Sequence, residues 1–324
     1  MAGHPDPGVK MARVVVCEFM DERAVAALRA AHEVLYDPAL VDDGARLRAE
    51  AACCDALVVR NRTQVRGALL GALAPRCKVV GRLGVGLDNI DLEGCRVQGV
   101  AVIPATGANA LAVAEYVIAA ALVLLRGVYG ASAALAGGRW PRAALSEGRE
   151  SAGKVLGVVG FGSIGQTTAR LAQALGMQVI AHDALRPAAD PAYAAAGVRG
   201  CDLDELLAQA DAVSLHLPLL ETTRGLFDAA RLARMKRGAV LINTARGGIV
   251  DEQALAAALR SGALAGAALD VFAQEPLPAA AHFQDCPNLI LTPHVAGVTR
   301  EANERVSFLI ADRVAQALQA AAAR

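Results

Sequence analysis

The sequence lacks an excess of charge of either sign. Its 32 Lys and Arg residues are balanced by 32 Asp and Glu residues. Proteins that bind nucleic acids or anionic membrane surfaces by electrostatic attraction carry clusters of one charge sign. We therefore expect neither a nucleic acid nor a membrane among the partners of this protein.

Paired cysteine motifs and long apolar runs are also missing. The seven cysteines are odd in number and show neither C-x-x-C nor the Cys/His spacing of a zinc site, so we expect reduced thiols and no metal. The most apolar segment, Tyr116 to Leu125, is about half as long as a membrane span, and no charged-then-apolar leader opens the chain. These absences predict a cytoplasmic protein, and 324 residues are enough for two domains.

Aromatic residues make up only 3% of the chain, and Trp140 is its single tryptophan. It stands in the loop Gly137 to Pro141. A lone tryptophan in such a chain is more typical of a packing anchor than of a ligand stack. We expect Trp140 at a contact between two subunits of a homodimer that is joined through the second domains.

The most informative stretch that is present is Lys154 to Arg170, KVLGVVGFGSIGQTTAR, where an apolar run breaks at three glycines and resumes with helical spacing. Gly160, Gly162 and Gly165 form the G-x-G-x-x-G pattern between a strand and a helix. The first glycine permits a tight turn, the second admits backbone N–H groups to a pyrophosphate, and the third lets helix and strand pack closely. The pattern predicts a dinucleotide-binding site.

The next predicted strand, residues 178–181, is followed by Asp183. A carboxylate at this position of a dinucleotide-binding domain accepts hydrogen bonds from both hydroxyls of the adenosine ribose and repels a 2′-phosphate. The sequence therefore predicts NAD rather than NADP as the cofactor, although Arg186 leaves some tolerance for NADP.

Strand-like and helix-like runs alternate along the chain, which is the pattern of parallel sheets covered by helices. We expect about five strands in a first domain and six in a second. The first set is residues 14–19, 33–36, 56–59, 78–80 and 100–103, and the second is residues 156–159, 178–181, 212–215, 239–242, 266–270 and 289–291. The predicted fold class is α/β, with a doubly wound parallel Rossmann domain and a smaller, flavodoxin-like substrate domain.

The expected domain boundaries make the smaller domain discontinuous. Residues 11–106 and 299–324 form the substrate domain, because the amphipathic helix over residues 300–321 is expected to fold back onto the first part of the chain. Residues 107–298 form the NAD-binding domain. Its first helix, residues 109–126, has no polar face, so we expect it to pack between the domains or against a partner subunit.

Three residues with complementary chemistry follow three predicted strands of the second domain. Arg246, Glu275 and His294 are distant in sequence, but turns that follow parallel strands share the edge of the sheet at which ligands bind. Arg246 offers a charged, planar fork to a carboxylate, His294 can exchange a proton near neutral pH, and Glu275 can orient the imidazole. Together they predict a site that moves a proton on a carboxylate-bearing substrate.

The motifs resemble those of a known family. The sequence is similar to the D-2-hydroxyacid dehydrogenases over nearly its whole length, in the motifs GRLGVGLDNID (81–91), GVVGFGSIG (157–165), LHLPL (215–219), INTARGGIVDEQAL (242–255), GAALDVFAQEP (266–276) and LTPHVAG (291–297). The resemblance implies NAD-dependent hydride transfer between a 2-hydroxy acid and a 2-keto acid. It implies that Arg246 binds the substrate carboxylate, that His294 is the acid and base with Glu275 as its partner, and that Val85 and Gly86 donate backbone hydrogen bonds to the carboxylate.

The resemblance also implies a set of cofactor-binding residues at the ends of the strands, in which Asp270 faces the nicotinamide carboxamide. The full set is Gly160, Gly162, Ser163, Ile164, Gly165, Asp183, Leu217, Pro218, Thr223, Thr244, Ala245, Arg246, Asp270, His294 and Gly297. Two departures from the family pattern are Ser163, where many relatives carry Arg, and Ala105-Thr106-Gly107, where a Pro-Gly is usual. Glu275 argues against the formate dehydrogenase branch, which places Gln there.

Arg60 and Arg62 follow the predicted strand 56–59, where phosphoglycerate dehydrogenases show a similar motif. A second basic group suggests a hydroxy acid with a second anion, of the sulfolactate or 3-phosphoglycerate type, and the chain resembles the sulfolactate dehydrogenase branch. The alternative is a solvated pair of arginines at the end of a strand. Two other functions stay open: a generic hydroxypyruvate or glyoxylate reductase, and an NAD-sensing corepressor that acts as a dimeric binding module, which the lack of long polar tails disfavours.

Overall fold

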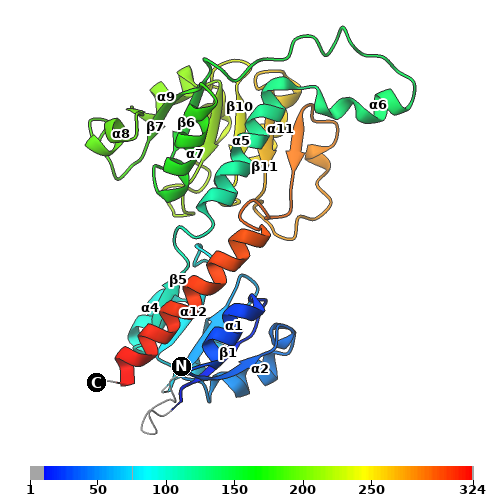
Figure 1. Ribbon diagram of the computed structural model, residues 1–324. Helices are drawn as coiled ribbons and strands as arrows, with labels where there is room; N and C mark the ends of the chain where they lie inside the picture. Colours follow the sequence, from blue (N-terminus) through cyan, green and yellow to red (C-terminus); the bar gives the residue numbers. More distant parts are fainter. Residues whose placement is uncertain (1–10, 75, 323–324) are drawn as a thin grey trace, which may run out of the picture. The chain divides into compact units, whose positions relative to one another are not determined.

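The computed structural model describes residues 11–74 and 76–322, and the chain divides into two compact units. Unit 1 comprises the chain up to Asn109 and from Thr299 onward, and unit 2 comprises Ala110–Val298 (Figure 1). The polar start of the chain, residues 1–10, lies outside the described residues, as do residues 323–324 of the expected substrate domain.

Unit 1 is built on a five-stranded parallel sheet in the order β2-β1-β3-β4-β5. The strands are β1 (Arg13–Val16), β2 (Glu33–Tyr36), β3 (Ala56–Val59), β4 (Val79–Arg82) and β5 (Ala101–Pro104). This is the flavodoxin-like order, and it confirms the five predicted strands. The order reverses between β1 and β3, and ligands of such sheets bind at the carboxyl ends of the strands that flank the reversal.

Successive residues of β1 point to opposite faces of this sheet and enter two separate cores. Val14 and Val16 pack with side chains of α1 (Glu22–Arg29) and α12 (Arg300–Ala322). Val15 packs on the other face with side chains of α2 (Gly44–Ala51), α3 (Gly67–Leu73) and α4 (Leu92–Val97). The 3-10 turn η1 (Leu40–Asp42) precedes α2.

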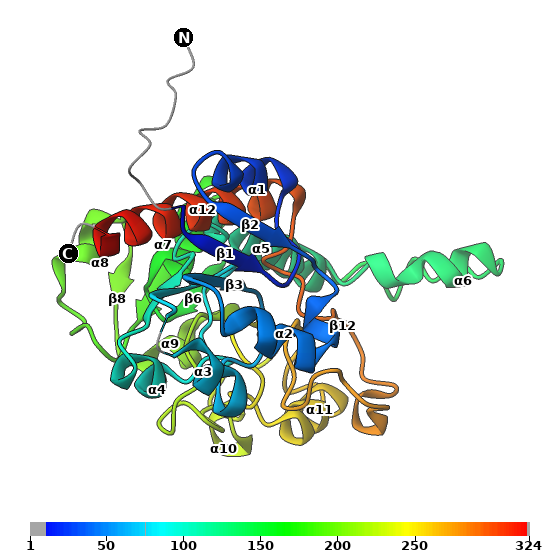
Figure 2. The same ribbon diagram turned by 90° about the horizontal axis from the view of Figure 1, so that it is seen from below.

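The helix α12 lies beside α1 on one face of the unit 1 sheet (Figure 2). Val306, Ile310 and Val314 are buried along the side of α12 that the apolar spacing predicts. The helix thus packs against α1 and the strands of unit 1. At the start of α1, the side chain of Asp21 caps the helix by accepting a hydrogen bond from the N–H of Arg23.

Unit 2 contains a seven-stranded parallel sheet in the order β12-β11-β10-β9-β6-β7-β8. The strands are β6 (Val155–Val159), β7 (Gln178–His182), β8 (Arg199–Gly200), β9 (Ala212–Leu215), β10 (Val240–Asn243), β11 (Gly266–Leu269) and β12 (Leu289–Leu291). The predicted count of six strands is wrong, because β8 is an edge strand of two residues, too short to leave a periodic pattern. The doubly wound Rossmann order is confirmed, and its reversal lies between β6 and β9.

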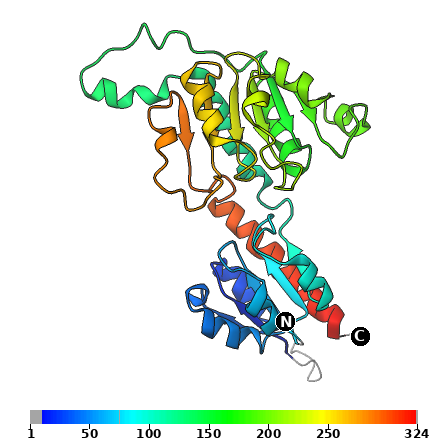
Figure 3. The ribbon, with the colours of Figure 1, turned by 180° about the vertical axis from the view of Figure 1, so that it is seen from behind.

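Helices cover both faces of the unit 2 sheet (Figure 3). One core contains side chains of α5 (Ala110–Arg126), α7 (Ser163–Ala174) and α8 (Pro191–Ala195), and the other contains side chains of α9 (Leu203–Gln209), α10 (Ala229–Leu232) and α11 (Glu252–Arg260). The apolar helix α5 packs against α7, β10 and β11. Burial within unit 2 covers most of its apolar side chains, whereas Leu111 and Leu122 remain exposed, at 39% and 38%.

The segment between α5 and β6 forms an arm that stands apart from the sheet of unit 2 and carries η2 (Tyr129–Ala131) and α6 (Ser132–Ala136) (Figures 1 and 2). No residue of η2 or α6 is buried, and Trp140 is 75% exposed. Trp140 is therefore no packing anchor within its own chain. No single described helix is long and apolar enough to cross a membrane, and α5 passes that test only together with Tyr129–Ala136, from which it is bent by 71°.

Candidate active site

The turn after β10 is shaped by the buried side chain of Asn243. Its Oδ1 accepts a hydrogen bond from the N–H of Ala245, and its Nδ2 donates to the carbonyl of Arg246, both at 3.0 Å. The chain then passes so close to the next loop that a Cβ on Gly247 would lie 1.7 Å from the carbonyl oxygen of Phe272. Arg246 is thus held at the carboxyl edge of the sheet. Sequence reasoning assigned no role to Asn243, although an Asn at a strand end often bonds the backbone two residues on.

Asp270 follows β11 and fixes the neighbouring loop after β12. Its carboxylate, which is 1% exposed, accepts hydrogen bonds from the hydroxyl of Thr292 (2.6 Å) and from the N–H groups of Val295 and Ala296 (2.8 Å each). Its backbone carbonyl accepts a fourth hydrogen bond from the N–H of His294 (2.8 Å). The conformation of the loop that carries His294 therefore depends on Asp270.

His294 and Glu275 are in direct contact. Nδ1 of His294 lies 2.7 Å from Oε2 of Glu275, and the other oxygen of Glu275 accepts a hydrogen bond from the N–H of Phe272 at 3.0 Å. When Nδ1–H donates to the carboxylate, Nε2 is left to exchange a proton with a substrate. The backbone of His294 has a φ of 57°, a left-handed conformation that costs a residue with a side chain about 1–3 kcal/mol and is concentrated at functional sites.

The three predicted catalytic residues follow three strands that are neighbours in the sheet. Arg246 comes after β10, Glu275 after β11 and His294 after β12. They therefore lie along one edge of unit 2, and its chemistry is suited to binding a carboxylate and exchanging a proton beside it. Within residues 11–74 and 76–322, no group of three or more His, Cys, Asp and Glu side chains has the arrangement of a metal site.

The glycine turn after β6 has the geometry that a dinucleotide requires. Gly160 has a φ of 96°, and a Cβ there would lie 2.4 Å from the carbonyl oxygen of His216, which follows β9. A Cβ on Gly165 would lie 2.2 Å from the carbonyl oxygen of Gly160, so helix and strand pack as closely as expected. A Cβ on Gly162 would meet no atom of the protein within 4 Å. The open side of the turn is therefore at the start of α7, where Ser163 and Ile164 open the helix and its N-terminus attracts a phosphate.

Asp183 lies directly after β7 and contacts the glycine turn. Its Oδ2 accepts a hydrogen bond from the N–H of Phe161 (2.8 Å), and its Oδ1 accepts one from the N–H of Leu185 (2.9 Å). A carboxylate offers about four acceptor positions, so this one keeps capacity for the hydroxyls of a ribose.

Two threonines of the expected cofactor set differ in what their hydroxyls do. The hydroxyl of Thr223 donates to the carbonyl of Pro218 (2.6 Å) and accepts from the N–H of Leu220 (2.8 Å), so it closes the loop after β9 that also contains Leu217. The hydroxyl of Thr244 is buried and has no hydrogen-bond partner among the described residues. Buried hydroxyls are normally paired, and a polar group of a bound cofactor would supply the missing partner.

In unit 1, the loop of residues 60–63 follows β3 and is held by a carboxylate at the end of β1. Glu18, which is 4% exposed, accepts hydrogen bonds from the N–H groups of Arg60 (2.7 Å), Arg62 (3.1 Å) and Thr63 (3.1 Å). Asn89 holds the same loop through Nδ2, which donates to the carbonyls of Arg60 (3.1 Å) and Thr63 (2.7 Å). Sequence reasoning assigned no role to Glu18 or Asn89, because only the adjacency of the strands brings them to this loop.

The two arginines of this loop have different surroundings. The guanidinium of Arg60 donates from Nη2 to Oδ1 of Asn303 (2.7 Å) and lies 5.6 Å from the ring centroid of Phe19, so both of these partners are neutral. Arg62 forms an ion pair in which both carboxylate oxygens of Asp42 accept hydrogen bonds. After β4, Val85 and Gly86 donate no backbone hydrogen bond within the part of the chain that the structure describes, which leaves these N–H groups available to a ligand.

The family model for the NAD-binding domain of D-isomer specific 2-hydroxyacid dehydrogenases matches residues 118–296. This chain belongs to that family. The (S)-sulfolactate dehydrogenase of Chromohalobacter salexigens is 54% identical over 308 residues, which are 95% of this chain and 99% of the relative.

Two less similar proteins also match this chain over nearly its whole length. The chloroplastic D-3-phosphoglycerate dehydrogenase 2 of Arabidopsis thaliana is 41% identical over 316 residues, which are 97% of this chain but 50% of that relative. Among solved structures, the holo form of the D-mandelate dehydrogenase of Rhodotorula graminis has a TM-score of 0.85 at 27% identity, with 95% of this chain and 94% of that chain covered.

As a D-isomer specific 2-hydroxyacid dehydrogenase, the protein is an NAD-dependent oxidoreductase whose substrate is a small hydroxy acid or keto acid. The predicted family, α/β fold, enzyme class and NAD cofactor are confirmed. The two alternatives, a generic hydroxypyruvate or glyoxylate reductase and an NAD-sensing corepressor, are not favoured beside a dehydrogenase that is 54% identical.

Proposed function

We propose that this dehydrogenase interconverts a 2-hydroxy acid that carries a second anionic group with the corresponding 2-keto acid, and that the substrate is of the sulfolactate or 3-phosphoglycerate type. The observation that carries the proposal is the position of Arg60. Its loop follows β3 at the reversal of the unit 1 sheet, where such sheets bind ligands. Two relatives at 54% and 41% identity bear the names of hydroxy acids with a second anion.

The surroundings of Arg60 suit an anion. Burial of its guanidinium lowers the pKa of Arg60 below its usual value, whereas the charge of Glu18 opposes that shift. A guanidinium that is partly removed from water, next to an amide and an aromatic ring, binds an anion more strongly than a solvated one does. Asn303 and Phe19 also restrict the side chain, so little conformational freedom is lost when an anion binds.

We assign the chemistry at the carboxylate end of the substrate to unit 2. Arg246 binds the carboxylate of the substrate. The backbone N–H groups of Val85 and Gly86 in unit 1 are likewise assigned to a carboxylate, as the resemblance to the family implies. Nε2 of His294 takes the proton of the 2-hydroxyl group in oxidation and returns it to the keto oxygen in reduction, while Glu275 holds the ring. A nicotinamide held at the loops of Asp270 and Thr244 would supply the hydride chemistry at C2 of the substrate.

We assign the cofactor site to the carboxyl edge of the unit 2 sheet. The pyrophosphate is placed at the open side of the glycine turn, where Gly162, Ser163 and Ile164 begin α7, and the adenosine ribose at Asp183. The nicotinamide end is assigned to the loops that carry Asp270 and the unpaired hydroxyl of Thr244. The remaining residues of the set line the path between these points: Gly160, Gly165, Leu217, Pro218, Thr223, Ala245 and Gly297.

The test of the second anion is Arg60→Ala, assayed with sulfopyruvate, 3-phosphohydroxypyruvate and pyruvate. A charge-assisted hydrogen bond contributes about 1.5–3 kcal/mol, so kcat/KM for the two larger acids should fall about tenfold to a hundredfold. Pyruvate lacks the second anion, so kcat/KM for pyruvate should change little. Arg96→Ala is the matched control, because Arg96 is an exposed arginine of unit 1 that is paired with Glu93.

Equal losses for all three acids after Arg60→Ala would contradict the proposal. So would a wild-type enzyme that prefers pyruvate to both larger acids. The comparison among substrates separates the loss of an anion site from general damage to the fold. A destabilised unit 1 would lower kcat/KM for pyruvate as well.

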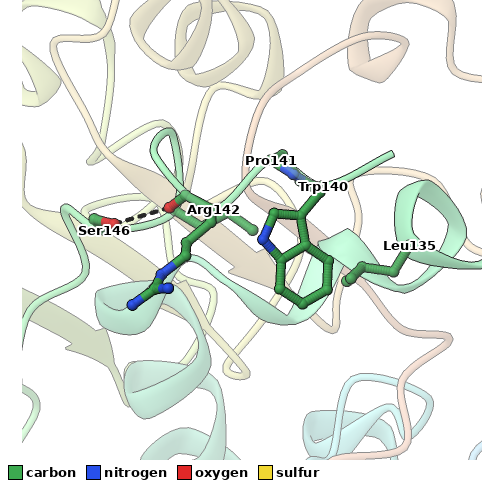
Figure 4. Close-up of a pocket in the computed structure, with 6 residues that line it drawn as sticks. Leu135, Trp140, Pro141, Arg142 and Ser146 are labelled. Carbon is green, nitrogen blue, oxygen red and sulfur yellow. Dashed lines mark hydrogen bonds between the residues drawn. The ribbon is translucent and has the colours of Figure 1, made fainter. Parts of the chain in front are cut away.

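We further propose that two copies of the chain form a homodimer through the arm of unit 2. Figure 4 shows a shallow pocket of about 260 Å³ on this arm, lined by Leu135, Trp140, Pro141, Arg142, Leu145 and Ser146. The helix and the tryptophan are exposed in the single chain, and exposed rings are enriched at interfaces between subunits. The seven free cysteines support a cytoplasmic location, where thiols stay reduced.

The mass of the protein in solution, measured by light scattering over a dilution series, tests the dimer. Trp140→Ala should shift the protein toward the monomer at concentrations where the wild type is dimeric. Val97→Ala, which removes an apolar side chain that is 71% exposed in unit 1, should leave the mass unchanged. A wild type that is monomeric at micromolar concentration would contradict the assignment.

A further inference from the structure

Among the described residues, two carboxylates contact the 60–63 loop, which carries Arg60 and Arg62. Glu18 accepts hydrogen bonds from the backbone N–H groups of both arginines, and Asp42 pairs with the guanidinium of Arg62. Glu18 exerts its charge on both arginines, since it opposes the lowering of the pKa of Arg60 and contributes to the raised pKa of Arg62. The place proposed for the second anion therefore offers much less positive potential than two arginines in sequence suggest.

The two arginines are also unequal in what they offer to an anion. Arg60 is engaged by an amide and an aromatic ring, neither of which neutralises its charge. Arg62 is engaged by Asp42, whose carboxylate occupies the guanidinium fork, with 3.3 Å between Nη1 and Oδ2. Asp42 lies 20 residues earlier, in η1, and its side chain is 62% exposed. One arginine is thus available and the other is paired.

We infer that the second-anion site is built for a group with a single negative charge, a sulfonate, and that Asp42 determines this specificity by neutralising Arg62. A sulfonate carries one negative charge throughout the pH range in which proteins fold. A phosphate monoester carries about 1.5 to 2 at pH 7. One available guanidinium matches the sulfonate, whereas the second charge of a phosphate would meet the carboxylates of Asp42 and Glu18.

This inference rests on the proposed function, because it concerns the group that Arg60 binds. It predicts that the wild-type enzyme has a higher kcat/KM with sulfopyruvate than with 3-phosphohydroxypyruvate. The two acids share the keto acid end and differ in the charge and linkage of the far group.

The test is the ratio of kcat/KM for these two acids in Asp42→Asn, a change that keeps the shape of the side chain and removes its charge. The ratio should move toward the phosphate by about threefold, the size of one interaction between charges several ångströms apart near a protein surface. The shift should shrink as salt is raised from about 0.02 M to about 0.5 M, because exposed charges are screened. Glu93→Gln is the matched control: it removes a carboxylate of unit 1 that is also paired with an arginine, and it should leave the ratio unchanged.

A second variant keeps the test decisive. The double variant Arg62→Ala/Asp42→Asn has no guanidinium at position 62 that the loss of Asp42 could make available to a ligand. The ratio of kcat/KM should therefore move toward the phosphate less than it does in Asp42→Asn alone. An unchanged ratio in Asp42→Asn, or a wild type that prefers the phosphate, overturns the inference. If the wild type still prefers both larger acids to pyruvate, and Arg60→Ala still removes that preference, the proposed function stands without the inference. If pyruvate is preferred, the proposed function itself fails.

Discussion

Two buried carboxylates, Glu18 in unit 1 and Asp270 in unit 2, occupy equivalent places in two different sheets. Each follows a strand, is at most 4% exposed, and accepts three hydrogen bonds from the loop after the neighbouring strand. Loops at a sheet edge have few backbone partners of their own, so a carboxylate between two strands can satisfy several N–H groups at once. The loops differ in what they present: Arg60 in unit 1 and His294 in unit 2.

The two loops also differ in how firmly other groups hold them. The loop in unit 1 has a second support in Asn89, and none of its residues has a positive φ. The loop in unit 2 contains His294 in the left-handed conformation, flanked by residues that bond Asp270. A strained residue keeps its conformation only while its surroundings enforce it. Removal of the carboxylate should therefore matter more for the loop that carries His294 than for the loop of residues 60–63.

The largest effect should come from the group that the unit 2 loop presents. His294→Ala removes the proposed acid and base, so kcat should fall by about a hundredfold or more in both directions, while the affinity for NADH, followed by fluorescence titration, changes little. A variant with nearly wild-type kcat would remove His294 from the mechanism.

Asp270→Asn tests the support beneath that group. The amide can accept at Oδ1 but presents N–H groups to at least one of the three donors, which leaves a buried N–H unpaired at a cost of about 1–3 kcal/mol. We expect a lower free energy of unfolding in urea and a loss in kcat of about tenfold to a hundredfold, because the loop that carries His294 relaxes. If the variant loses stability but retains kcat, Asp270 does not position His294.

Asp183 is a third carboxylate at a strand end, and it extends the comparison because its side chain accepts two hydrogen bonds from the described residues, one fewer than Glu18 or Asp270. Its remaining acceptor positions are assigned to the ribose. Asp183→Ala should therefore narrow the preference for NAD over NADP by about tenfold, measured as the ratio of kcat/KM for the two cofactors. An unchanged ratio would mean that another residue contacts the ribose.

The sequence allowed most of the fold to be predicted, because runs of apolar residues report directly on burial. Strands such as β3, whose four residues are all buried, and the apolar side of α12 are visible in the pattern. The exception is β8, whose two residues are recruited to the sheet by pairing with β7. A strand that depends on its neighbour in this way leaves no local signal.

The places of the candidate residues were predictable where they follow from position along the chain. Arg246, Glu275 and His294 were expected at one edge because parallel strands end there, and they do follow neighbouring strands. The glycine turn was predictable because its spacing is local. The hydrogen bonds of Glu18 and Asp270 were not predictable, since each depends on which strand lies beside it. The pairing of Arg62 with Asp42 was not predicted for the same reason. The two residues follow different strands, β3 and β2, and only the folded sheet brings them together.

Glu18→Gln is the counterpart of the change at Asp270, and its effect should be smaller. The loop keeps Asn89, so we expect kcat to remain and KM for the larger acids to rise about threefold to tenfold as Arg60 loses its position. KM for pyruvate should stay as in the wild type. Glu93→Gln, an exposed carboxylate of the same unit, is the control. A fall in kcat for all substrates would show that the effect of Glu18 extends beyond the loop of residues 60–63.

The smallest effect is expected at a residue that supports the glycine turn without touching the proposed chemistry. His216 follows β9, its Nε2 lies 3.0 Å from Oγ of Ser214, and its carbonyl is the atom that a side chain on Gly160 would meet. Burial lowers the pKa of His216 from 6.5 to about 4. Between these two values the unfolded chain binds a proton and the folded chain does not, so the stabilisation is complete above pH 6.5 and is lost as the pH falls through about 4.

His216→Gln cannot be protonated, and its free energy of unfolding in urea should fall less steeply than that of the wild type from pH 7 to pH 5, with kcat at pH 8 nearly unchanged. Parallel pH profiles for the two proteins would show that His216 is accessible to protons in the folded state.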